Sequence, residues 1–128
     1  MNPAKNEKPA GSAGFNHERA NNSSYSNNLA QIYRRVNALC QKWNMTREEF
    51  ERAASVWALI YRDFAPRDVQ TTFTGRPSLY SEHAKTLALA FFLVYVEADD
   101  RLQALGEPDD VDASACWQIA LALAGGTP

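Results

Sequence analysis

The sequence has few of the residues that carry out chemistry in enzymes. Its 128 residues include two histidines and two cysteines, and its six glycines form no phosphate-binding loop. His83 and Asp99 lie on one predicted helix, sixteen residues or about 24 Å apart, so they do not meet within one chain. We therefore predict that the protein is not an enzyme and that it binds no cofactor.

A metal-binding motif is also missing. Four acids lie close together at Glu107, Asp109, Asp110 and Asp112, but without the central glycine and distal glutamate of an EF-hand calcium loop. Acidic side chains at the start of a helix interact favourably with the helix dipole. We interpret these acids as helix-start residues and predict no metal site.

Long hydrophobic runs and a large net charge are absent as well. The longest apolar run, residues 86–96, has eleven residues, whereas a membrane-spanning helix needs about 20. The first fifteen residues contain no apolar segment typical of a signal peptide. The net charge of −2 gives no general attraction to nucleic acid or to a membrane surface. These features favour a cytoplasmic protein that binds neither.

What the sequence does contain is a helix-forming core. On a helix, the run 86–96 is apolar all round, with Leu87 and Phe91 on one side and Leu89 and Phe92 on the other. A helix of this kind is covered by protein on every side. We predict a compact all-α domain of four helices over residues 27–126, with this hydrophobic helix at its centre.

The remaining helices are predicted from apolar residues that recur every three or four positions. The first starts at Asn27 or Asn28, the central one runs from about residue 78 or 81 to 105, and the last spans about 109–124. The second starts with a capping box formed by Thr46 and Glu49 and stops at Pro66. Its expected buried side chains are Phe50, Ala53, Ala54, Trp57, Ile60, Tyr61 and Phe64. A loop without structure of its own is predicted over residues 66–77.

Residues 1–26 are rich in asparagine and serine and poor in large apolar side chains. Such a segment buries too little apolar surface to offset the entropy of ordering, so we predict a disordered N-terminal arm. In composition the arm resembles the export leaders of bacterial effectors injected by specialised secretion systems. That resemblance implies export as an alternative to the cytoplasm.

Two cysteines fall on apolar helix faces, Cys40 on the first helix and Cys116 on the last. A disulfide between them stays open, but two separate buried thiols are the commoner arrangement in a reducing compartment.

The last helix suggests a binding surface. Cys116, Ile119, Ala120 and Leu123 form one apolar stripe, which we expect to face the core. Trp117 and Leu121 form a second, and tryptophan is enriched at interaction hot spots. We predict that this second stripe meets another copy of the chain in a homodimer, or a partner helix. The alternative is that the arm or the 66–77 loop covers it.

Charged residues suggest two further contact regions. Seven acids and one base lie between residues 97 and 112, and this acidic corner includes Glu97, Asp99, Asp100 and Asp110. It either attracts a cationic partner or is only a solvated face. In the 66–77 loop, Arg67 and Arg76 are candidates to bind a carboxylate or phosphate, unless they pair with Asp63 and Asp68.

Taken as a whole, these patterns favour a small non-enzymatic protein–protein interaction module, such as an adaptor, inhibitor, immunity protein or secreted effector. The alternative is a DNA-binding regulator, because a short turn joins the first two helices as in a helix-turn-helix. The outer face of the first helix also carries a modest basic strip that includes Arg35 and Lys42. Against this alternative, Glu48, Glu49 and Glu51 open the second helix and would face the phosphate backbone.

Overall fold

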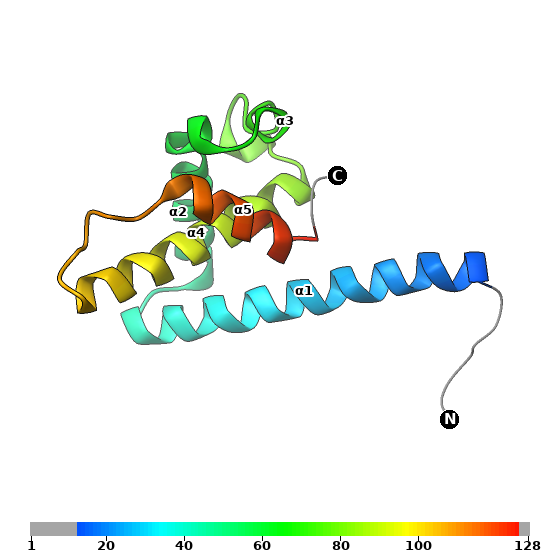
Figure 1. The fold of residues 1–128 in the computed structure, drawn as a ribbon, viewed down its shortest axis with the longest axis horizontal. Helices are drawn as coiled ribbons and strands as arrows, with labels where there is room; N and C mark the ends of the chain where they lie inside the picture. The colour runs from blue at the N-terminus through cyan, green and yellow to red at the C-terminus, as the bar shows by residue number, and fades with distance from the viewer. Residues whose placement is uncertain (1–12, 126–128) are drawn as a thin grey trace.

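The computed structural model describes the backbone of residues 13–125 and the side chains of residues 28–125. Within this range the chain forms helices and no strands. The elements are α1 (Ala13–Trp43), α2 (Arg47–Ile60), the 3-10 helix η1 (Arg62–Phe64), α3 (Arg67–Gln70), the 3-10 helix η2 (Pro77–Leu79), α4 (Glu82–Ala104) and α5 (Ala113–Leu123). The four long helices α1, α2, α4 and α5 form the predicted compact all-α domain (Figure 1).

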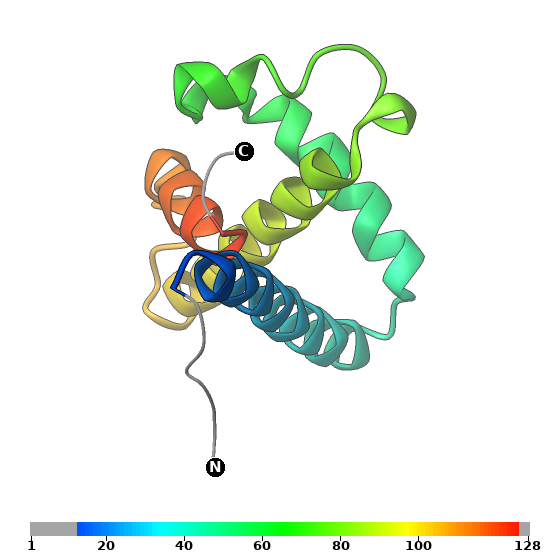
Figure 2. The same ribbon diagram turned by 90° about the vertical axis from the view of Figure 1, so that its right-hand side faces the viewer.

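Helix α4 is the centre of the domain, as the sequence predicted. It packs against α1, α2 and α5, and it crosses between α2 and α5 (Figure 2). Every residue from Thr86 to Val94 is buried. The one polar side chain in this stretch, Thr86, donates its hydroxyl to the Glu82 carbonyl at 3.0 Å. No helix of the described chain is long and apolar enough to cross a membrane.

Helix α1 begins at Ala13, well before the expected start at Asn27 or Asn28. The first twelve residues of the predicted disordered arm lie outside the described residues. The N-terminal half of α1 extends past the other helices (Figure 1), whereas its C-terminal half lies on the core. There Ile32, Val36 and Leu39 are buried at the predicted spacing of three and four residues.

The N-terminal end of α2 is fixed by the predicted capping box. The Glu49 amide donates to Thr46 Oγ1 at 3.1 Å, and the Thr46 amide donates to Glu49 Oε1 at 2.7 Å. These hydrogen bonds satisfy two amides that have no partner within the helix. The bond from the Thr46 amide also holds the pKa of the Glu49 carboxyl below its usual value, because the charged form is the better acceptor.

The C-terminal end of α2 comes earlier than predicted. The helix ends at Ile60, and the chain continues through η1 before it reaches Pro66. The carbonyl of Tyr61 accepts a 3-10 bond from the Phe64 amide at 3.1 Å and a bond from the Trp117 indole at 2.9 Å. The tighter turn rotates the following residues around the helix axis. Phe64, expected in the core, is therefore exposed. Ile60, also expected in the core, is exposed because it is still part of α2 and lies about 40° around that helix from the exposed Val56.

The segment between Pro66 and Pro77 is not the structureless loop that the sequence suggested. It contains the single helical turn α3, and its side chains Val69 and Phe73 are fully buried. The Phe73 ring lies 5.3 Å from Tyr80 and 5.5 Å from Trp117. Arg62 Nη1 donates to the Phe73 carbonyl at 2.9 Å. The segment thus covers one side of the core.

Candidate interaction surface

Trp117 and Leu121, the predicted interface residues, face the core of their own chain. Trp117 is fully buried, and its ring stacks on Phe91 with centroids 4.0 Å apart. Leu121 is 8 % exposed. The expectation of an outward stripe on α5 is corrected, because Phe73 of the 66–77 segment lies over Trp117, the alternative recognised in the sequence.

The other stripe of α5 is correspondingly split. Cys116 and Ala120 are buried as expected, but Ile119 is half exposed and Leu123 is partly exposed. Helix α5 therefore turns the face with the largest side chain, Trp117, toward α4.

The predicted acidic corner is divided in the structure. Glu97 accepts two hydrogen bonds from the guanidinium of Arg35, and Asp100 lies 2.9 Å from Lys42 Nζ. Both bases are on α1, so these acids join α4 to α1. Asp99 accepts from Gln103 Nε2 at 2.8 Å. Asp110 is exposed and forms no ion pair among residues 28–125.

Arg67 and Arg76 are both exposed, and the structure does not bring them together with Asp63 or Asp68. Neither arginine forms an ion pair within the described side chains. Arg67 opens α3, and Arg76 precedes η2 after Gly75, whose φ of +79° suits glycine. Their guanidinium groups are free to meet an acid from outside this part of the chain.

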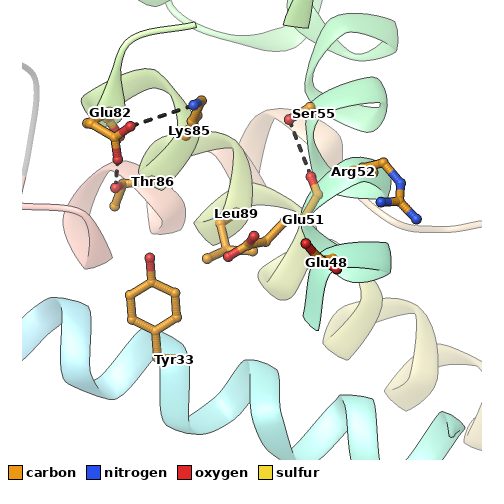
Figure 3. A pocket seen from close by; sticks show the side chains of 9 residues that line it. All are labelled: Tyr33, Glu48, Glu51, Arg52, Ser55, Glu82, Lys85, Thr86 and Leu89. Atoms are coloured by element: carbon orange, nitrogen blue, oxygen red, sulfur yellow. Dashed lines mark hydrogen bonds and ion pairs between the residues drawn. The ribbon is translucent and has the colours of Figure 1, made fainter. Parts of the chain in front are cut away.

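A hollow of about 390 Å³ lies between α1, α2 and α4 (Figure 3). Its floor includes Leu89, and the Tyr33 hydroxyl points into it from α1. Its rim carries Glu48, Glu51, Arg52, Glu82 and Lys85. Several of these charges are matched within the chain, since Glu51 lies 3.6 Å from Arg47 and Glu82 lies 3.6 Å from Lys85. The hollow therefore shows no single charge or polarity that selects a ligand.

Three of the exposed large apolar side chains among the described residues lie close together in sequence on α2 and η1, and sequence reasoning missed them; the others are Trp43, Leu79, Leu105 and Ile119. Val56, Ile60 and Phe64 are 49 %, 60 % and 52 % exposed, at successive steps of four residues. We refer to these three residues as the α2 stripe. The sequence pattern favours a core position for Ile60 and Phe64 because they continue the spacing of Phe50 and Trp57. The one indication in the sequence was Val56, an apolar residue beside the predicted buried face of the second helix and not part of it.

An aromatic cluster lies between α2 and α4, and Phe64 of the α2 stripe contacts it, with its ring 6.0 Å from that of Tyr61. The Trp57 ring lies 5.5 Å from Tyr61, 5.6 Å from Phe92 and 5.7 Å from Tyr95. The Tyr95 hydroxyl donates to Tyr61 Oη at 3.2 Å. Burial, followed by this hydrogen bond, raises the pKa of Tyr95 well above its usual value, so its ring stays neutral at physiological pH.

The groups that could carry chemistry are few and dispersed. Cys40 and Cys116 are separate buried thiols, as favoured from the sequence, and burial raises the pKa of each. A thiol with a raised pKa is a poor nucleophile. Among the residues that the structure describes, no three histidine, cysteine or acidic side chains lie close enough to hold a metal ion.

Comparison with known proteins identifies no relative, since no family model, no curated protein and no solved structure matches this chain.

Proposed function

We propose that this protein is a small protein–protein interaction module that binds its partner through the α2 stripe. The observation that carries the proposal is the exposure of Val56, Ile60 and Phe64 on consecutive turns. Single exposed apolar residues are common on protein surfaces, but several of them close together are typical of a binding face.

The shape of the stripe favours a helical or flat partner surface. Val56 and Ile60, four residues apart on α2, form a ridge, and such ridges pack into the grooves of another helix. Phe64 follows in η1. Charged residues close to the stripe in sequence suit an interface as well, since Arg52, Asp63 and Arg67 are exposed and form no ion pair among residues 28–125. Interfaces commonly combine an apolar centre with a polar rim of this kind.

The alternative of a DNA-binding regulator has less support. It depends on the basic strip of α1, and two members of that strip, Arg35 and Lys42, pair with Glu97 and Asp100. Glutamates on the rim of the hollow beside α2 would also repel phosphate.

The experiment that tests the proposal compares Ile60→Lys with Leu105→Lys. Both residues are more than half exposed and stand at the C-terminal end of a helix, where a lysine suits the helix dipole. The tagged wild type, Ile60→Lys and Leu105→Lys are cross-linked in the native cell and recovered. We expect a product with another protein, or with a second copy, that Ile60→Lys loses and Leu105→Lys keeps. Products unaffected by Ile60→Lys would overturn the proposal.

A further inference from the structure

We draw no further inference here: the strongest candidate, the exposed apolar patch of Val56, Ile60 and Phe64 on α2 and η1, belongs to the surface already proposed for binding, and nothing in the structure shows what covers it.

Discussion

The sequence predicted an exposed apolar stripe on α5 and a buried one at the end of α2, and the structure shows the reverse. On α5, Trp117 and Leu121 form a second stripe that looked available to a partner, yet they face α4 and Phe91. On α2, Ile60 and Phe64 continue the core spacing of Phe50 and Trp57, yet both are more than half exposed. Helical spacing identifies residues that share a face, and the side chains of other elements decide which face is covered.

We expect the largest loss of stability when the buried side chain of α5 is removed. Trp117→Ala removes the ring stacked on Phe91 and the indole bond to the Tyr61 carbonyl, and it leaves a cavity at the centre of the core. We expect the free energy of unfolding, measured by urea denaturation, to fall by about 4 to 5 kcal/mol. A loss below about 1 kcal/mol would show that Trp117 is not part of the core.

The covering segment gives the next largest effect. Phe73→Ala removes the side chain that lies against Trp117 and Tyr80, and we expect a loss of about 3 kcal/mol because the segment relaxes in part. Thr74→Ala, at the exposed neighbouring position, is the matched control and should change the free energy of unfolding by less than about 0.5 kcal/mol. Equal losses for the two variants would contradict the burial of Phe73.

The N-terminal end of α2 is the counterpart of its irregular C-terminal end. Thr46→Ala removes the acceptor of the Glu49 amide, and we expect a loss of about 1 kcal/mol in the urea experiment. Thr46→Ser keeps the hydroxyl and should stay close to the wild type. If the alanine variant matched the wild type, the capping box would have no role in stability.

The same capping box predicts a small dependence of stability on pH. The pKa of Glu49 is lower in the folded chain, so its contribution is present above the unfolded value of 4.5 and is lost as the pH falls through the folded pKa. Glu49→Gln should remove this part of the acid-induced loss, which unfolding curves between about pH 6 and about pH 3 measure. An unchanged acid profile in the glutamine variant would assign the loss to other carboxyl groups.

We expect the smallest change in stability when a residue of the α2 stripe is replaced. Ile60→Lys places a charge where water already reaches the side chain, so the stability of the monomer should change by no more than about 0.5 kcal/mol. The melting temperature at high dilution, where association is absent, measures it. A loss comparable to that of Trp117→Ala would show that Ile60 belongs to the core.

Much of the fold follows from sequence because the relevant interactions are local. The apolar run of α4, the spacing of Ile32, Val36 and Leu39, and the Thr46–Glu49 box each depend on residues within a turn or two of one another. The two unpaired thiols also followed from their positions on apolar faces.

The candidate surface was harder to predict because its cause is not local. At the early end of α2, the Tyr61 carbonyl accepts a hydrogen bond from an indole 56 residues further along the chain. The burial of Phe73 over Trp117 joins two elements that have no relation in sequence. The pairing of Glu97 with Arg35 spans 62 residues and divides a run of acids that looked continuous. Hydrophobic periodicity describes one helix at a time and contains none of these contacts.

The bond from the Trp117 indole to the Tyr61 carbonyl has a consequence for the order of folding. During synthesis the whole of α2 and η1 is made before α5. The Tyr61 carbonyl therefore has no bond from the Trp117 indole until the end of the chain has been made. Until then, nothing from α5 favours the 3-10 turn, and we expect the helix to run on toward Pro66, which changes the direction of the Phe64 side chain. Docking of α5 would complete the core and give Phe64 its observed position in the same step. Phe64 would therefore join Val56 and Ile60 in the α2 stripe only on a finished chain, so nascent chains present an incomplete binding surface.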